Sequence, residues 1–390
     1  MFFGAGASTS GVREHVRAGT EVVDGLRGLA IALVFAFHLW TFSLATPHAP
    51  FTVFVRAGYL GVELFFVISG FCLFFPYAQH ALATGAKPTL GQFAYRRFIK
   101  IVPSYLVALL VTFAVALPYF IDKRTAWLPL AIHLAFVNNW FTDPIVELNS
   151  VFWSLGVEVQ FYLIFPLLAL AFVRSPVVAL LATIAVGLGY RYGFGAYLVR
   201  EPVVRQVPAY LDVFGFGMFA AYAVVFLRTR MRVPKGELVF TALALVAVAA
   251  IVALLTSANA VFFAPQGPLR WNLPNRTLLG ASFALLIVAS CLAAAWWRAL
   301  VANPVLVFLS LVSYNLYLWH TLVMKVLTIR GMRPPTYDVP GADDAWKLPF
   351  IVASIVASLV VATALTYFVE RPLLATVRPQ RFAFRLRRRP

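Results

Sequence analysis

The stretch VVDGLRGLAIALVFAFHLW, residues 22–40, decides the fold class. It is an apolar run close to the 20 or so residues that an α-helix needs to cross a bilayer, yet it contains Arg27 and His38. On an α-helix, positions eleven residues apart are separated by about three turns and about 16 Å of rise, so both side chains lie on one face. Ionisable side chains are costly inside a membrane and therefore mark candidate functional sites.

The whole chain has the composition of a polytopic membrane protein. Of its 390 residues, 62% are hydrophobic and 12% are charged, whereas soluble domains carry about 25% charged residues. The N-terminal residues are polar and glycine-rich and lack the pattern of a cleaved signal peptide, so we expect the N-terminus to stay attached. Cys72 and Cys291 both lie in apolar runs, and we expect neither a disulfide nor a metal site.

Ten apolar runs are interpreted as membrane spans. They lie near residues 25–45, 58–80, 101–121, 151–173, 176–190, 207–227, 238–257, 276–296, 305–325 and 348–369. An eleventh candidate, at residues 127–141, is short and contains Pro129 and His133, so we expect an interfacial or re-entrant segment there. The sequence therefore predicts an all-α transmembrane bundle of about ten spans.

The basic residues predict the orientation of this bundle. With the N-terminus inside, the predicted cytoplasmic segments collect most of the 32 lysines and arginines, including the tail RFAFRLRRRP at residues 381–390. Basic residues favour the cytoplasmic side of a membrane. The net charge of +17 is therefore interpreted as basic loops that face anionic lipid, and no nucleic-acid partner is expected. We predict cytoplasmic termini, with an N-terminal segment at 1–23, a membrane domain at 24–373 and a basic tail at 374–390.

Further polar side chains recur within the predicted spans. Glu63 lies in the second span, Ser154 and Glu158 lie four residues apart in the fourth, and Asp212 lies in the sixth. The ninth span contains SYNLYLWH, residues 313–320, with several hydroxyls and a second histidine. Polar groups at matched depths predict a chamber shared between helices, which is typical of an active site or a transport path.

Six strings resemble, in order and spacing, the membrane-bound acyltransferase family 3. This family includes polysaccharide O-acetylases and macrolide O-acyltransferases. The strings are DGLRGLAIALVFAFH (24–38), GVELFFVISGF (61–71), YRRFIKIVPSY (95–105), WSLGVEVQFYLIFP (153–166), SYNLYLWH (313–320) and FVERPL (368–373). The resemblance covers residues 24–373 and implies ten transmembrane helices in a bacterial cytoplasmic membrane.

The resemblance also implies a reaction and its partners. An acyl-CoA donor, expected to be acetyl-CoA, would enter from the cytoplasm, and its acyl group would pass to a hydroxyl of a sugar, a lipid-linked glycan or a macrolide. No permanently bound cofactor is expected. The family's functional arginine and histidine of the first helix fall on Arg27 and His38. Its usual Arg-x-x-Arg pair falls on Arg97 and Lys100, a departure because lysine lacks the planar fork that grips phosphate.

Side-chain chemistry suggests which of these residues bind the donor and which act in catalysis. The cations Arg27, Arg96, Arg97 and Lys100 suit the CoA phosphates. His38 suits the thioester end, where a histidine can act as general base near neutral pH. The acyl group could instead rest transiently on His38, although direct transfer is favoured.

The remaining polar residues of the spans are expected to support these steps. Glu63 or Glu158 could orient the second ring nitrogen of His38, and the sequence leaves open which one does. The side chains expected to contact substrate are those of Ser154, Tyr162, Ser313, Tyr317 and His320.

A transporter or channel with an intramembrane histidine and carboxylate relay is the alternative function. Transporters often contain paired broken helices in two matching halves, and the sequence shows no such internal symmetry. A scaffold role accounts least well for the polar residues in the spans.

Overall fold

The computed structural model describes residues 21–45, 51–82, 86, 88–120, 126–141, 147–195, 205–230, 236–333 and 344–376. In these ranges the secondary structure is helical, without strands. Ten helices of the described chain are long and apolar enough to cross a membrane, which confirms the predicted all-α architecture. Most of the predicted terminal segments, 1–23 and 374–390, lies outside the described residues.

The bounds of the elements follow the predicted spans in order. The first half contains α2 (Glu21–Ser43), α3 (Thr52–Arg56), η2 (Gly58–Leu60), α4 (Gly61–Ala81), α5 (Leu90–Ala116), η3 (Leu117–Tyr119), α6 (Trp127–Leu134), η4 (Asn138–Trp140), α7 (Phe152–Arg174) and α8 (Pro176–Gly195). The second half contains η5 (Val207–Tyr210), α10 (Leu211–Arg230), α11 (Glu237–Ala260), α12 (Gly267–Leu292), α13 (Ala295–Val301), α14 (Pro304–Leu327), η6 (Thr328–Met332), α15 (Lys347–Leu365), η7 (Thr366–Glu370) and α16 (Arg371–Thr376).

The eleventh candidate span is a short helical segment, as expected. Its helix α6 has eight residues, which rise only about 12 Å. His133 on this helix is buried, and its Nδ1 donates to the carbonyl of Pro129 at 2.8 Å. Burial lowers the pKa of His133 to about 4. A short helix with a neutral, internally bonded histidine agrees with a segment that does not cross the bilayer.

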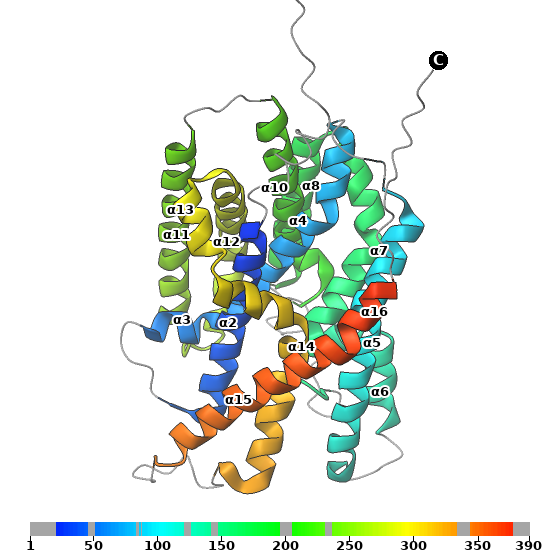
Figure 1. Ribbon diagram of the computed structural model, residues 1–390, viewed down its shortest axis with the longest axis vertical. Coiled ribbons are helices and arrows are strands. Elements are labelled where there is room, and N and C mark those ends of the chain that lie inside the picture. Colours follow the sequence, from blue (N-terminus) through cyan, green and yellow to red (C-terminus); the bar gives the residue numbers. More distant parts are fainter. Residues whose placement is uncertain are drawn as a thin grey trace, which may run out of the picture.

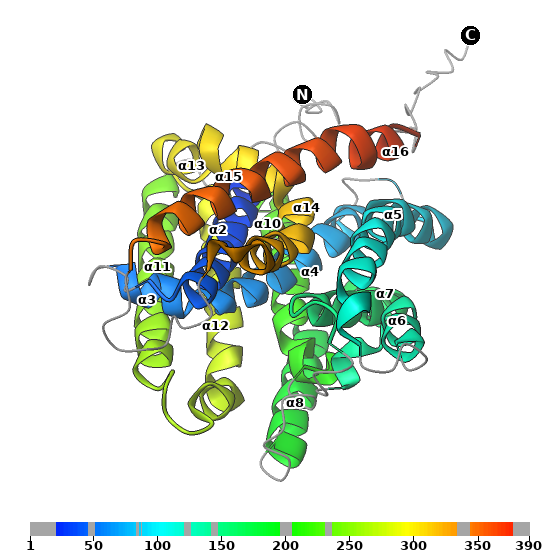
Figure 2. The same cartoon turned by 90° about the horizontal axis from the view of Figure 1, so that it is seen from below.

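Four helices, α2, α4, α10 and α14, form the centre of the bundle. Figures 1 and 2 show them near the middle, with α11 and α12 on one side and α5, α6 and α7 on the other. Small residues let these helices approach closely, as is usual in membranes. A Cβ at Gly28 of α2 would lie 1.9 Å from the Leu306 carbonyl oxygen of α14, and a Cβ at Gly217 of α10 would lie 2.0 Å from the Val67 carbonyl oxygen of α4.

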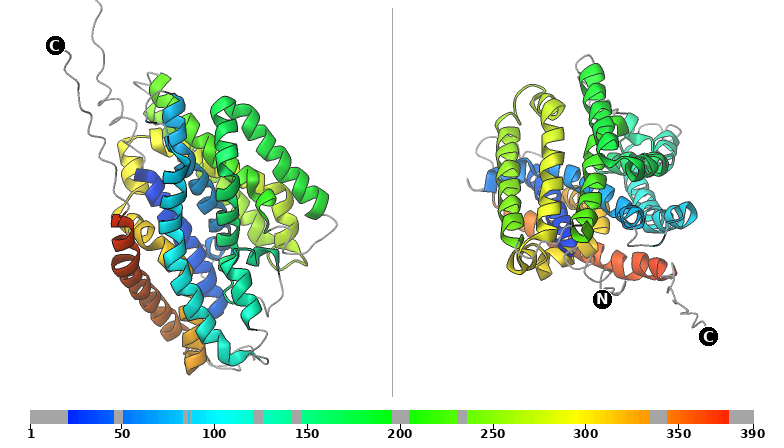
Figure 3. Two further views of the ribbon diagram at one scale, coloured as in Figure 1. Left: turned by 90° about the vertical axis from the view of Figure 1, so that its right-hand side faces the viewer. Right: turned by 90° about the horizontal axis from the view of Figure 1, so that it is seen from above.

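Helix α15 lies at the margin of the bundle. It crosses obliquely in front of α2 and α14 in Figure 1, and both views of Figure 3 place it at the edge. Only 22% of its apolar stretch is buried, compared with 72% for the span that contains α4. Its continuation through η7 and α16 brings Glu370 back towards the centre, where this carboxylate is buried.

Two helices begin well before the predicted spans. Helix α5 starts at Leu90, after Thr89 caps it by accepting a hydrogen bond from the Gln92 amide. Helix α12 starts at Gly267 with a proline in its first turn. The predicted starts near 101 and 276 were late because polar first turns reduce the mean hydropathy. Arg97, assigned to a loop, therefore lies on α5, and Arg276, at the start of its predicted span, lies well inside α12.

Candidate active site

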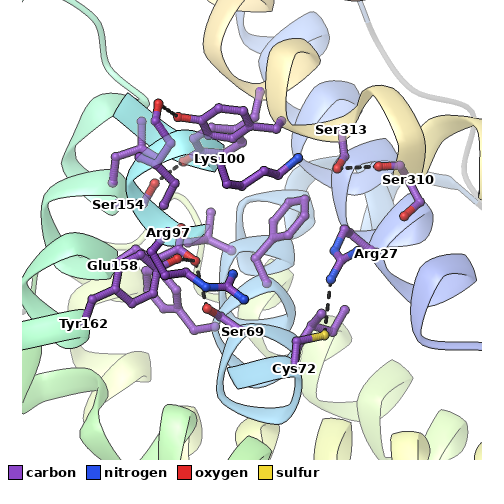
Figure 4. Close-up of a pocket in the computed structure, with 18 residues that line it drawn as sticks. Arg27, Ser69, Cys72, Arg97, Lys100, Ser154, Glu158, Tyr162, Ser310 and Ser313 are labelled. Carbon is purple, nitrogen blue, oxygen red and sulfur yellow. Dashed lines mark hydrogen bonds between the residues drawn. The ribbon is translucent and has the colours of Figure 1, made fainter. Parts of the chain in front are cut away.

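A first cavity of about 190 Å³ opens among α2, α4, α5, α7 and α14. Three cations line it. Arg27 enters from α2 on one side, and Arg97 and Lys100 enter from α5 on the other (Figure 4). Arg96 is exposed and is not among the described residues that line this cavity. Three of the four predicted donor-binding cations thus meet in one place.

Arg27 is held in the lining of the first cavity by two neighbours. Its Nη1 donates to Asp24 at 3.0 Å, one turn earlier on α2. Its Nη2 donates to the Cys72 Sγ of α4 at 3.3 Å (Figure 4). The Arg27 side chain keeps 30% of its surface exposed, so it can still reach an anionic ligand.

Lys100 and Arg97 are also fixed by their surroundings. The Lys100 ammonium forms an ion pair with the buried Glu370 of η7 and lies 5.4 Å from the ring centre of Tyr314. The Arg97 guanidinium lies 5.9 Å from the ring centre of Tyr162. Contacts of this kind orient a cation over an aromatic face. The cavity therefore presents positioned positive charge, which suits a ligand with phosphate groups.

Glu158 belongs to this first cavity. Its Oε1 accepts hydrogen bonds from the Ser69 hydroxyl at 2.8 Å and the Tyr162 hydroxyl at 2.6 Å (Figure 4). His38 lines a different cavity. The structure thus places Glu158 in one cavity with Arg27, Arg97 and Lys100 and separates it from His38. The alternative in which Glu158 orients the His38 ring does not fit this arrangement.

A second cavity, of about 400 Å³, lies among α2, α4, α7, η5 and α12 and contains His38. The His38 Nδ1 lies 2.9 Å from the Val34 carbonyl oxygen. Because a carbonyl can only accept, Nδ1 carries the proton and Nε2 keeps its lone pair. That is the tautomer that a general base requires. The backbone therefore takes the orienting role that the sequence assigned to a carboxylate, and within the described residues neither Glu63 nor Glu158 hydrogen-bonds His38.

His320 packs directly against His38. The ring centres are 4.9 Å apart and the rings meet edge to face. His320 is fully buried, and its Nδ1 donates to the Leu316 carbonyl at 2.8 Å. It is not among the described residues that line either cavity. The structure therefore places His320 behind His38, and its predicted contact with substrate stays a prediction.

Glu63 lines the second cavity beside an arginine that the sequence analysis missed. The Glu63 carboxylate forms an ion pair with the Arg276 Nε at 3.5 Å, and both side chains are buried. Arg276 also donates to the Tyr210 hydroxyl at 3.0 Å and lies over the Tyr210 ring. A buried ion pair needs such additional partners to offset its desolvation. The pair fixes polar groups in the wall of the second cavity.

The two cavities meet at Val62 of α4 and Tyr317 of α14, which line both of them. The Tyr317 hydroxyl lies 2.6 Å from the Ser154 Oγ. Ser154 and Ser313 line the first cavity only, as does Tyr162. Of the five residues predicted to contact substrate, four therefore line the first cavity, and Tyr317 connects it to the second.

Another buried charge pair lies outside both cavities. Arg191 of α8 donates to both carboxylate oxygens of Asp212, at 3.0 and 2.7 Å, and both residues are fully buried. Asp212 is thus part of a structural link between α8 and α10, and the polar chamber predicted from the sequence does not include it. In the described chain, no group of three or more histidine, cysteine, aspartate or glutamate side chains could hold a metal ion.

Comparisons with known proteins show the family of the chain. A family model described as an acyltransferase domain matches residues 21–367. The peptidoglycan O-acetyltransferase of Listeria monocytogenes serovar 1/2a is 25% identical over 378 residues, which cover 90% of this chain and 55% of that protein. A putative O-acetyltransferase of Staphylococcus aureus strain COL is 26% identical over 392 residues, 90% of this chain and 56% of that protein.

A shorter relative matches over most of its own length. A putative acetyltransferase of Acidianus two-tailed virus is 26% identical over 321 residues, 79% of this chain and 84% of that protein. The chain spans about half the length of the two bacterial relatives. No solved structure gives a significant match. Because the family model covers nearly the whole described membrane bundle, the chain belongs to acyltransferase family 3 as a multi-pass membrane member.

Proposed function

We propose that the chain is an acyl-CoA-dependent membrane O-acyltransferase. The donor, expected to be acetyl-CoA, would occupy the first cavity from the cytoplasmic side, and a hydroxyl-bearing acceptor would occupy the second. The observation that carries this proposal is the meeting of the two cavities at Val62 and Tyr317. One cavity holds positioned cations and the other holds a histidine with a free Nε2 lone pair. A ligand in each would bring thioester and hydroxyl together.

The chemistry then follows from the residues present. His38 Nε2 takes the proton of the acceptor hydroxyl, and the oxygen attacks the thioester carbonyl. The carbon–sulfur bond breaks, CoA leaves as a thiolate, and the imidazolium returns its proton to that thiolate. Direct transfer is favoured over an acyl-histidine because His38 lines the acceptor cavity itself.

The lining of the second cavity supports a sugar as acceptor. Aromatic rings of Trp153, Tyr210 and Phe262 lie in its wall with the polar side chains of Arg205 and Asn272. Aromatic faces with a few placed hydrogen-bonding groups suit a ring that has both apolar faces and hydroxyls. The Listeria relative is named a peptidoglycan O-acetyltransferase, which supports a glycan acceptor in a bacterial cytoplasmic membrane.

The first prediction tests the general base. Membranes that contain the full chain are given labelled acetyl-CoA and a panel of glycan and macrolide acceptors, and products are identified by mass spectrometry. We expect His38→Ala to lower transfer by about 10²- to 10⁴-fold at unchanged membrane abundance, because that is the usual contribution of a positioned general base. His80→Ala is the matched control, since His80 is exposed on α4.

Two outcomes of this experiment would contradict the proposal. If His38→Ala keeps activity within about tenfold of the unmodified chain, His38 is not the base. If the thioester stays intact with every acceptor while a solute crosses the membrane, the transporter alternative replaces the acyltransferase.

A further inference from the structure

The first cavity has a basic end and an end that adjoins the second cavity. Along α4 it is lined from Cys72 to Val62, ten residues that rise about 15 Å. Arg27 contacts Cys72, so the cations mark one end of this path and Val62 marks the other. On α14 the lining runs from Ser310 to Tyr317, which brings Tyr317 to the Val62 end as well.

Val62 and Tyr317 form the wall beside the junction of the two cavities. Val62 and Tyr317 are each 7% exposed, and both line the second cavity as well as the first. The donor cavity therefore ends where the acceptor cavity begins. A thioester carbonyl that meets an acceptor hydroxyl has to lie against these two side chains.

Both side chains of this wall are held in place. The Tyr317 hydroxyl contacts the Ser154 Oγ at 2.6 Å and donates to the Val151 carbonyl at 3.1 Å, so two bonds to the α7 end fix it. The Tyr317 ring also packs edge to face with Phe65, at 6.0 Å between centres. Val62 is β-branched, and such side chains keep one strongly preferred χ1 rotamer in a helix. The wall therefore has little freedom to yield to a longer ligand.

We propose that Val62, together with Tyr317, sets the length of the acyl group that the enzyme accepts. This inference rests on the proposed function, in which acyl-CoA fills the first cavity with its phosphates at the basic end. The pantetheine arm then spans the cavity, and the acyl group ends against Val62. Each additional methylene of the acyl chain has to displace the Val62 side chain, or it prevents the thioester from reaching this end of the cavity. Removing two methyl groups at position 62 creates room for about one to two further carbons.

The test measures binding, so it needs neither an acceptor nor turnover. The purified full chain in detergent is titrated with CoA and with acetyl-, propionyl-, butyryl- and hexanoyl-CoA. For the unmodified chain we expect the affinity to fall beyond a short acyl group. In Val62→Ala the longest tolerated acyl group should increase by one to two carbons, with up to about a fourfold gain in affinity for each methylene newly buried. Val62→Leu should shift the profile in the opposite direction.

Val67→Ala is the matched control. Val67 is a fully buried valine on the same helix and is not among the described residues that line either cavity. It should leave the chain-length profile unchanged, and size-exclusion chromatography shows whether each variant stays folded. Two results would overturn this inference and leave the proposed function standing. One is an unchanged chain-length profile in both Val62 variants while CoA still binds normally. The other is an equal shift of the profile in Val67→Ala. An unmodified chain that binds no CoA would overturn the proposed function together with it.

Discussion

At the scale of single residues, the two ionisable side chains of α2 serve different cavities. Arg27 lines the first cavity and His38 lines the second, and the helix separates them by about 16 Å. A cation at the mouth can bind the donor equally in its ground state and transition state. A base at the acceptor end acts only as the hydroxyl loses its proton. Substitutions at these two positions should therefore affect different kinetic constants.

The donor site allows a prediction about its cations. Arg97→Ala should raise the KM for acyl-CoA, with little change in the acceptor KM, because Arg97 lines the first cavity and Arg96 does not. Arg96→Ala is the matched control on the same helix turn. The effect of Arg97→Ala should shrink at high salt, since mobile ions screen charge contacts that water can reach. Steady-state kinetics at two ionic strengths measures both. If both substitutions change the KM for acyl-CoA equally, the two arginines serve only to orient the chain in the membrane.

Most of the ionisable residues of the site could be found from the sequence, and their partners could not. Arg27, His38 and Glu63 are conspicuous because each interrupts an apolar run. Arg276 was missed because it stands at the first position of the predicted span 276–296, where a basic residue is usual at the end of a membrane helix. Its partner Glu63 is more than 200 positions away in the chain. The local periodicity of a sequence contains no information on a pair so far apart. An arginine close to an apolar run is only a weak indication of a buried site residue.

At the scale of elements, the C-terminal segment accounts for the FVERPL string. Glu370 at the end of η7 accepts a hydrogen bond from the Asn315 amide of α14 at 2.7 Å and pairs with Lys100 of α5. Asn315 also donates to Thr366 at 3.0 Å. The wider turn of the π-helix allows these two contacts on neighbouring turns, and such turns are frequent at functional sites. The marginal helix α15 is thereby linked to the first cavity through Lys100.

Close packing of α4 against α10 is the basis of the next prediction. Gly217→Ala would place a Cβ 2.0 Å from the Val67 carbonyl oxygen, and backbone cannot yield as a flexible side chain does. We expect a loss of about 1 to 3 kcal/mol in stability, the usual range for overpacking, seen as a lower midpoint of thermal unfolding in detergent. Acyl transfer should fall as well, because α4 carries Val62 and Glu63.

Gly189→Ala is the control for this substitution. Within the described chain, a Cβ at Gly189 of α8 would meet nothing within 4 Å. Alanine is the better helix former by about 1 kcal/mol, so this variant should unfold at the same temperature or slightly higher. A midpoint for Gly217→Ala that matches the control would mean that the α4 and α10 contact tolerates an added methyl group.

At the scale of the whole molecule, the number of spans was predictable because a bilayer imposes a length and an apolar composition on each helix. The crossing pattern of the helices was not, since apolar surfaces on many helices are interchangeable in lipid. The close approaches at Gly28 and Gly217 decide that pattern, and a glycine in an apolar run does not name its partner. The two cavities result from this packing. The sequence therefore predicted many of the residues that line them, but it could not predict which residue lines which cavity.

The orientation of the bundle is the last prediction, and it decides whether the donor cavity faces the cytoplasm. Ala86, between α4 and α5, and Ala264, between α11 and α12, are both exposed and lie on opposite sides in a ten-span chain. Single cysteines at these positions, in a background with Cys72→Ala and Cys291→Ala, are treated with a membrane-impermeant maleimide in a bacterial host. Because basic residues favour the cytoplasmic side, Ala86→Cys should react only in inside-out vesicles and Ala264→Cys only in intact spheroplasts. The reverse pattern would turn Arg27 and Lys100 towards the outside, and cytoplasmic acyl-CoA could then not reach them.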